Sequence, residues 1–303
     1  MEEVPLLRLL SFLPYWKIFW HLDTKIYTIT KGNYNLKPQS TTFIGFTDDF
    51  ESSKAVLFGA PFDGTTSFKP GTRFAPAAMR EDSWAIESYS PYLDKDLDDM
   101  PLFDYGNLEL PYGDKMQVLQ MIEKTVDEIV DANKIPIMIG GEHLVSYAPV
   151  KSLVKKYPDL HVIHFDAHTD LRQELLDEAF SHATVIRRIS ELLPKGNVNQ
   201  FCIRSGLKEE FEWAKTNVHL EKFTYNTLAS CVKRLQDKPV YITIDLDVFD
   251  PSVFPGTGTP EPGGIDFQDM LTIIKTLSSL NGVVGMDVVE LSPKYDASGV
   301  STA

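Results

Sequence analysis

Five short runs of apolar, largely β-branched residues recur along the chain, each about as long as one strand: AVLFGA (55–60), IPIMIG (135–140), LHVIHF (160–165), VYITID (240–245) and VVGMDVV (283–289). Between them, apolar residues recur at helical spacing over 115–133, 209–217 and 266–280. Apolar strands that alternate with amphipathic helices are typical of a parallel sheet buried on both faces. We therefore predict an α/β fold with three layers, α/β/α, around a central parallel sheet.

Charge and cysteine content narrow the class of protein. The 303 residues carry a formal net charge of −14, which disfavours nucleic acid as a partner and favours a cationic small molecule. The two cysteines, Cys202 and Cys231, are too few for a disulfide framework. These features predict a cytoplasmic protein.

The amino-terminal segment differs in composition from the rest of the chain. Residues 1–30 are rich in apolar and aromatic side chains, but charged residues and a proline interrupt the run 6–20, which is too short to span a membrane. The Met-Glu-Glu start is unlike a signal peptide. We predict an atypical apolar segment over 1–30, suited to an oligomer contact and not to membrane insertion. No linker interrupts the chain after it, so residues 31–303 are predicted to form a single domain.

Polar side chains follow four of the apolar runs, at the point where each predicted strand ends. Parallel strands place their carboxyl ends at one edge of the sheet, where ligands bind in folds of this kind. Alternation along a strand is expected to point Asp166, His168 and Asp170 the same way. The residues expected at this edge are His143, Asp166, His168, Asp170, Asp245, Asp247 and Glu290. His164 shares the parity of Asp166 and is predicted to lie in the core behind it, and Glu142 is predicted to lie behind the ligands or in solvent.

Such a cluster requires a positive charge, because unpaired buried carboxylates are very costly. Two histidines and four aspartates exceed the needs of one structural zinc ion. The oxygen-rich set without thiolates favours Mn²⁺. Six such ligands suit two ions about 3.5–4 Å apart that share a water-derived hydroxide. The sequence therefore predicts two Mn²⁺ per chain at the carboxyl ends of the strands.

The sequence resembles the ureohydrolase family, which includes arginase, agmatinase, guanidinobutyrase and formimidoylglutamase, and it is most similar to agmatinase. The resemblance implies an arginase-like fold, which in family members usually continues into a carboxyl-terminal helix after the position of SGVST; the predicted domain lacks it. The motifs that carry the resemblance are GAPFDGTTSFKPGTRFAPAAMR (59–80), GGEH (140–143), DAHTD (166–170), SHAT (181–184), DLDVFDPSVFPGTGTPEPGG (245–264) and DVVELSP (287–293).

The resemblance also implies a role for each site residue. It gives His143 and Asp170 to one manganese ion, His168 and Asp247 to the other, and Asp166 and Asp245 to both. It makes His182 the proton shuttle and Glu290 the acid that holds the substrate guanidinium, so the expected catalytic residues are Asp170, His182 and Glu290. Without the resemblance two other interpretations are open: Ser181 could simply begin a helix through 184–190 with His182 as a bystander, and Glu290 could pair with Lys294.

The activity implied is manganese-dependent hydrolysis of a guanidino substrate, by attack of the metal-bridging hydroxide on the guanidinium carbon. Agmatine, cleaved to putrescine and urea in polyamine biosynthesis, is the expected substrate, because 170–184 lacks the Asn-x-His-Gly pattern of arginases and the protein is acidic. Guanidinobutyrate, guanidinopropionate, arginine and formimidoylglutamate are the alternatives. Two further alternatives are a non-catalytic guanidine- or polyamine-binding protein and a mononuclear zinc deacylase. A homo-oligomer, trimeric or hexameric, is also expected from the family.

Overall fold

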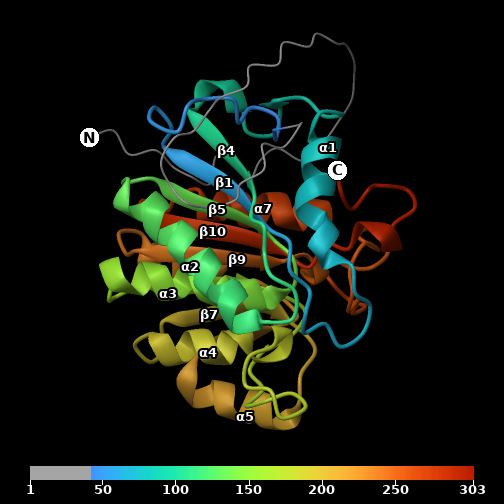
Figure 1. The fold of residues 1–303 in the computed structure, drawn as a ribbon. Coiled ribbons are helices and arrows are strands. Elements are labelled where there is room, and N and C mark those ends of the chain that lie inside the picture. Colours follow the sequence, from blue (N-terminus) through green and yellow to red (C-terminus); the bar gives the residue numbers. More distant parts are fainter. Residues whose placement is uncertain (1–41) are drawn as a thin grey trace.

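The computed structural model describes residues 42–303, so the predicted apolar segment 1–30 lies outside the described residues. The described chain forms an eight-stranded sheet with the order β4-β1-β5-β10-β9-β6-β7-β8 (Figure 1). Every pairing in it is parallel. The strands are β1 (Ala55–Ala60), β4 (Leu102–Asn107), β5 (Ile135–Gly140), β6 (His161–Phe165), β7 (Val198–Ile203), β8 (His219–Lys222), β9 (Val240–Asp245) and β10 (Val283–Val289). Strands β2 (Tyr89–Ser90) and β3 (Lys95–Asp96) form a separate antiparallel pair.

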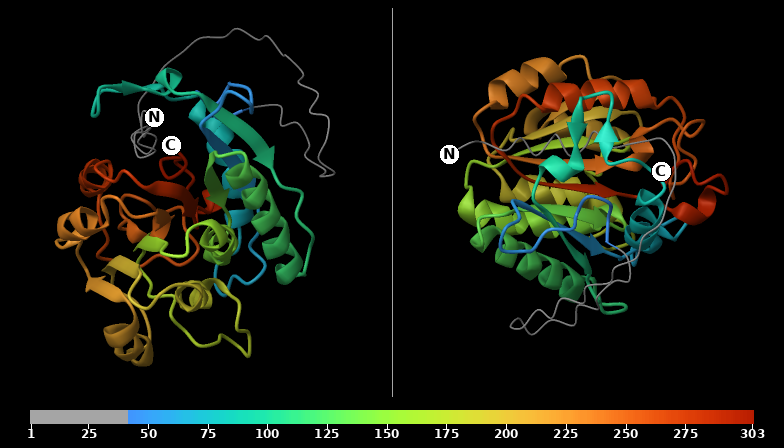
Figure 2. Two further views of the ribbon diagram at one scale, coloured as in Figure 1. Left: turned by 90° about the vertical axis from the view of Figure 1, so that its left-hand side faces the viewer. Right: turned by 90° about the horizontal axis from the view of Figure 1, so that it is seen from above.

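Helices cover both faces of the sheet, which confirms the predicted three-layer fold (Figure 2). Helices α2 to α5 pack on one face, and α1, α6 and α7 pack on the other. The helices are α1 (Ala75–Ser83), α2 (Lys115–Asp131), α3 (Tyr147–Lys156), α4 (Val185–Leu192), α5 (Lys208–Asn217), α6 (Leu228–Leu235) and α7 (Phe267–Leu277). Short 3₁₀ helices are η2 (Thr72–Phe74), η3 (Leu97–Asp99), η4 (His143–Ser146), η5 (His182–Thr184), η6 (Leu246–Val248) and η7 (Pro293–Tyr295).

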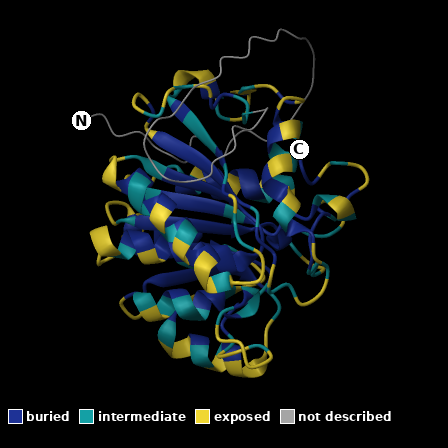
Figure 3. Ribbon diagram, in the orientation of Figure 1, coloured by how far each residue is buried: buried dark blue, intermediate teal, exposed yellow. Residues whose placement is uncertain are grey.

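Alternation along the strands builds one apolar core on each side of the sheet. In β1, Val56 and Phe58 pack under α2 and α3, while Leu57 packs on the opposite side. All six residues of β1 are buried, which explains why this strand is a continuous apolar run. Figure 3 shows the strands of the sheet as mostly buried and the helices as a mixture of buried and exposed residues.

The five predicted strands are confirmed, to within one residue at each end. The structure adds β4, β7 and β8, which the apolar pattern did not indicate. In β7, the buried polar residues Asn199 and Gln200 interrupt the run, and β8 is a short, partly exposed edge strand. Their polar side chains hide these strands from a search for apolar runs.

Helix α1 is fastened to β4 by a buried ion pair. Arg80 is 1% exposed, and its Nε and Nη2 atoms lie 2.7 and 2.9 Å from the two carboxylate oxygens of Asp104. The same guanidinium donates to the carbonyl oxygens of Pro76 and Gly106 and to the side chain of Asn107. This planar fork is why an arginine can be buried at this position.

The strand order decides where the polar loops meet. Strands β5, β10, β9 and β6 are consecutive in the sheet, so the four carboxyl ends that carry the predicted ligands are neighbours. None of the described helices is long and apolar enough to cross a membrane. The division of the chain into a segment 1–30 and a domain 31–303 stays a prediction.

Candidate metal centre

The predicted ligands are brought together mostly by loops rather than by strand alternation. Strand β6 ends at Phe165, so Asp166, His168 and Asp170 all lie beyond it, and Asp170 has a left-handed backbone with φ of 50°. Simple alternation was therefore the wrong reason for expecting these side chains to converge. Asp166 accepts a hydrogen bond from its own loop, from the amide of His168 at 2.5 Å. This contact folds the loop back toward the sheet edge.

His143 lies at the centre of one half of the cluster. Its Nδ1 atom is 3.2 Å from Asp166 Oδ2, 3.1 Å from Asp170 Oδ2 and 3.2 Å from Asp245 Oδ2. All four residues are less than one-tenth exposed. Three carboxylate oxygens and one imidazole nitrogen thus point at a common volume.

His168 occupies the other half. Its Nδ1 atom is 2.9 Å from Asp247 Oδ2 and 3.4 Å from Asp166 Oδ1. Asp166 therefore presents Oδ2 to the His143 half and Oδ1 to the His168 half. This arrangement is compatible with the predicted bridging role of Asp166, which stays a prediction. Asp245 is the last residue of β9 and presents Oδ2 to His143, while its Oδ1 accepts the amide N–H of Asp247 at 2.8 Å.

The donor set fits divalent cations. Within the described residues, His143, His164 and Asp166 form one group with ligand atoms inside 4.8 Å, and Asp166, His168 and Asp247 form a second. Among the described residues, the buried Nδ1 of His143 forms no hydrogen bond, although three carboxylate oxygens lie 3.1–3.2 Å from it. Burial raises the pKa of Asp170 to about 7, and it raises the pKa of Asp245 well above the ordinary range. Positive charge between these groups would stabilise their ionised forms.

Buried polar groups stand behind His143 on the side away from the carboxylates. The Nε2 atom of His143 lies 3.0 Å from Thr243 Oγ1, which donates to Asp287 Oδ1 at 2.6 Å. Tyr241 donates to the other oxygen of Asp287 at 2.5 Å. A polar partner on the second nitrogen fixes the ring orientation of a metal-binding histidine. The sequence did not predict a role for Thr243 or Asp287, although Thr243 is two residues before Asp245 and so is expected on the same face of β9.

His182 is partly exposed and is held by the loop after β1. Its amide donates to Thr65 Oγ1 at 3.1 Å, and its Nε2 atom is 3.0 Å from Ser67 Oγ. Burial lowers the pKa of His182 to about 4, so its imidazole is neutral. Ser181 does begin a short helix, η5, so the two interpretations of this segment are compatible. The sequence did not single out Thr65 or Ser67.

Glu142 fastens that loop to the sheet. Its carboxylate is fully buried and accepts from the amide and hydroxyl of Thr65 at 2.8 and 2.7 Å and from Thr66 Oγ1 at 3.2 Å. Burial raises the pKa of Glu142 to about 7. The solvent-exposed alternative for Glu142 is therefore wrong, and its position behind the ligands stays a prediction.

Glu290 faces the cluster from the end of β10. Its Oε1 atom accepts the amide N–H of His143 at 2.7 Å, and its own amide donates to Gly141 O at 2.8 Å. Burial raises its pKa well above the ordinary range. No ion pair between Glu290 and Lys294 occurs in the described part of the chain, so the alternative role for Glu290 is wrong.

One carboxylate near the centre was not predicted. The Oε1 atom of Glu261 is 3.8 Å from Nε2 of His168 and accepts from Ser205 Oγ at 2.9 Å.

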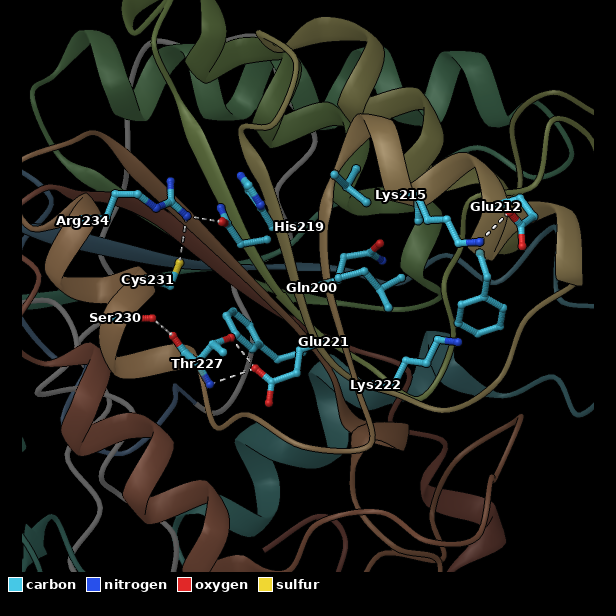
Figure 4. A pocket seen from close by; sticks show the side chains of 16 residues that line it. Gln200, Glu212, Lys215, His219, Glu221, Lys222, Thr227, Ser230, Cys231 and Arg234 are labelled. Carbon is cyan, nitrogen blue, oxygen red and sulfur yellow. Dashed lines mark hydrogen bonds and ion pairs between the residues drawn. The ribbon is translucent and has the colours of Figure 1, made fainter.

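A separate hollow of about 770 Å³ lies at the β8 edge of the sheet, between β7, β8, α5 and α6 (Figure 4). None of the eight predicted site residues lines that hollow. The candidate site is therefore the cluster at the carboxyl ends of β5, β10, β9 and β6.

The fold and this centre together define a class: three-layer α/β proteins that gather histidines and carboxylates at the carboxyl edge of a parallel sheet. Residues 53–303 match the Arginase family. An agmatinase of Bacillus cereus is 49% identical over 259 residues, which cover 84% of this chain and 89% of that protein. An N(1)-aminopropylagmatine ureohydrolase of Thermococcus kodakarensis is 39% identical over 248 residues, or 80% and 84% of the two chains.

The solved structures agree. The agmatine ureohydrolase of Thermoplasma volcanium superposes with a TM-score of 0.79 at 33% identity, covering 87% of this chain and 90% of that one. The chain therefore belongs to the arginase family. The predicted resemblance, and with it the prediction of an enzyme of this family, is confirmed.

Proposed function

We propose that the protein is a manganese-dependent ureohydrolase that converts agmatine and water to putrescine and urea. The observation that carries the proposal is the division of Asp166 between two histidines, with Oδ2 on the His143 side and Oδ1 on the His168 side. A carboxylate shared in this way is what a pair of ions requires. The identity to proteins named agmatinase supports the choice of substrate.

The residues present would hold two Mn²⁺ ions per chain. His143 and Asp170 would bind one ion, His168 and Asp247 the other, and Asp166 and Asp245 both. The carboxylate-rich donors favour Mn²⁺ over a softer ion. When bound, the ions lower the pKa of coordinated water and so supply a nucleophile at neutral pH.

The protein side chains orient the substrate. A guanidinium is planar and pairs with a carboxylate through two parallel N–H···O bonds, and Glu290 is the buried acid that faces the centre. The amide of His143 occupies only one carboxylate oxygen of Glu290. The pairing would hold the guanidinium carbon over the centre and would restore the charged form of Glu290.

Two side chains would move protons. Asp170 would accept the proton that water loses when it attacks the guanidinium carbon. His182, whose imidazole is neutral and whose Nε2 atom lies 3.0 Å from Ser67 Oγ, would act as a relay that takes up a proton and passes it to the amine that leaves as putrescine. Water contributes its oxygen to urea and, counted against the guanidinium form of the substrate, both of its hydrogens to the amine, which leaves in its ammonium form, so the reaction balances without a further reactant.

The substrate's tail is the finer part of the proposal. The segment 170–184 lacks the Asn-x-His-Gly pattern of arginases, and the net charge of −14 favours a cationic tail over a zwitterionic one. The relative named N(1)-aminopropylagmatine ureohydrolase makes that longer cation the second candidate. Guanidinobutyrate, guanidinopropionate, arginine and formimidoylglutamate stay as comparison substrates.

A urea-release assay with Mn²⁺ tests the proposal across these substrates. Agmatine should have the highest kcat/KM, and full metal occupancy without turnover of any of them would leave a non-catalytic binding protein instead. Metal analysis should find two Mn²⁺ per chain, whereas one tightly held Zn²⁺ together with deacylation of acetylated amines would point to a mononuclear deacylase.

Two variants separate the roles of the site residues. Asp166→Ala should abolish both metal binding and urea release. His182→Ala should keep the metal and lower kcat by about 10²-fold or more. Equal loss of metal in both variants would contradict the assignment.

We propose that the protein is cytoplasmic. Cys202 and Cys231 are both free and buried, which agrees with the reducing cytoplasm proposed from the sequence. We also propose a homo-oligomer, which analytical ultracentrifugation of the full chain would test.

A further inference from the structure

A fully buried histidine lies against the predicted bridging carboxylate without being one of the predicted ligands. The Nε2 atom of His164, in β6, is 2.8 Å from Asp166 Oδ2. With His143 and Asp166, His164 forms one of the two groups whose ligand atoms could hold an ion. It is therefore either a seventh ligand or a donor that positions Asp166, and its tautomer decides between them.

The tautomer is fixed from the next strand. Gln200, in β7, is fully buried, and its Nε2 atom lies 2.8 Å from the carbonyl oxygen of Thr169 and 3.0 Å from Nδ1 of His164. A carbonyl oxygen can only accept, so the side-chain atom of Gln200 that faces it is the amide nitrogen. If the amide were reversed, Oε1 of Gln200 would lie 2.8 Å from the carbonyl oxygen of Thr169, and neither oxygen could donate a hydrogen bond.

The second N–H of that amide points at Nδ1 of His164, which must therefore carry a lone pair. A neutral imidazole has one protonated nitrogen, so the proton is on Nε2. This N–H faces Asp166 Oδ2 and cannot bind a metal. A doubly protonated ring is excluded as well, because it would set two donors against each other at Nδ1.

We propose that Gln200 and His164 are positioning residues: Gln200 locks the tautomer of His164, and His164 holds Oδ2 of Asp166 for the ion on the His143 side. The inference rests on the proposed metal centre. The lock also keeps His164 from acting as a ligand in the group with His143 and Asp166. The ion is thereby directed to the volume where Asp166, Asp170 and Asp245 converge.

Figure 4 shows Gln200 in place on β7, among the residues around the hollow at the β8 edge. Strands β6 and β7 pair with His164 opposite Gln200, so the contact is fixed by sheet register and not by a loop. Partners of this kind that orient metal ligands typically change metal affinity about 10–100-fold when they are removed.

The first test reads the tautomer directly. Metal-stripped full-length protein labelled with ¹⁵N-histidine is examined by NMR at neutral pH, and the His164→Gln variant identifies the signals of His164. The expected result is a protonated Nε2 and an unprotonated Nδ1. The opposite tautomer, or an imidazolium, would overturn the inference whatever metal the protein binds.

The second test reads metal affinity by calorimetric titration with Mn²⁺. His164→Met should weaken Mn²⁺ binding about tenfold or more without changing the number of ions bound. His164→Gln places an amide N–H near the position of Nε2 and should restore most of the affinity. Gln200→Leu, which removes the lock but keeps His164, should also weaken binding and serves if His164→Met does not fold.

His161 provides the matched control. It is a second buried histidine of β6, three residues earlier and on the opposite face, and in the described part of the chain its charged neighbour is Asp159 and not a predicted ligand. His161→Met should bind Mn²⁺ as the parent does. Parent-like affinity of His164→Met would overturn the inference, as would loss of a whole ion that His164→Gln fails to restore. A parent protein that binds no Mn²⁺ would instead refute the proposed function, and the NMR result would still decide the tautomer.

Discussion

Removal of the guanidinium of Arg80 should destabilise the whole domain. In Arg80→Met, Asp104 keeps the amide hydrogen bonds from Phe43 and Gly106, both at 2.8–2.9 Å, but loses its counter-ion in a place where its side chain is 2% exposed. Breaking a buried ion pair by deleting one partner costs about 3–5 kcal/mol. Arg80→Lys should recover only part of this, because one ammonium cannot serve the acceptors that the planar fork reaches.

Urea unfolding at pH 7 measures the effect, with the slope of the transition checked for each variant. Lys155→Met is the matched control, because Lys155 pairs with Asp127 at 2.7 Å but its side chain is 52% exposed. Exposed pairs of this kind contribute about 0–1 kcal/mol. Arg80→Met combined with Asp104→Asn should cost less than the sum of the two single changes.

Two results would refute this reasoning. The first is a loss below about 1 kcal/mol for Arg80→Met, which would place the pair in the class of exposed ion pairs. The second is additivity of the two single changes, which would mean that the ion pair contributes nothing beyond its separate hydrogen bonds.

Three further perturbations have defined outcomes. Gly141→Ala would place its Cβ 1.9 Å from Phe62 O, so urea unfolding should show a loss of about 1–3 kcal/mol; an unchanged stability would contradict the close approach. Ser67→Ala removes the partner of His182 Nε2 and should lower kcat several-fold with metal content unchanged, whereas loss of metal would assign the contact a structural role. Although burial opposes it, hydrogen bonds from two nearby serines lower the pKa of Asp296 from 3.8 to about 2. Its stabilisation is therefore present above pH 4 and lost as the pH falls toward 2, and acid unfolding of Asp296→Asn should lack this component.

The strands could be predicted from the sequence because burial on two faces leaves an unambiguous apolar run. The gathering of the candidate ligands at one edge of the sheet could also be predicted, because these residues follow those runs directly. Asp166 and Asp245 are examples: each adjoins the last residue of a buried strand or is that residue. The route by which they converge could not be predicted. The left-handed backbone of Asp170 and the short helix that carries Asp247 arise from loop contacts that leave no periodic signal.

The groups that contact the candidate ligands from inside the sheet could not be predicted, for a different reason. Thr243 and His164 sit inside apolar strands with the parity of the ligands, where the default interpretation is a packed core residue. Gln200 interrupts β7 and so concealed that strand altogether. The role of each of these residues depends on the side chain that it contacts, and those contacts depend on the strand order, which no local sequence pattern encodes.

The central place of β10 has a consequence for biogenesis. During synthesis, β4, β1 and β5 can assemble as one half-sheet and β6, β7, β8 and β9 as another, but each half exposes an unpaired edge until residues 283–289 insert between β5 and β9. Insertion of β10 also brings Glu290, the residue after this strand, to the amide of His143. A ribosome-stalled chain that ends before residue 283 should therefore be prone to aggregation and dependent on chaperones, and metal capture should coincide with the last long-range step of folding.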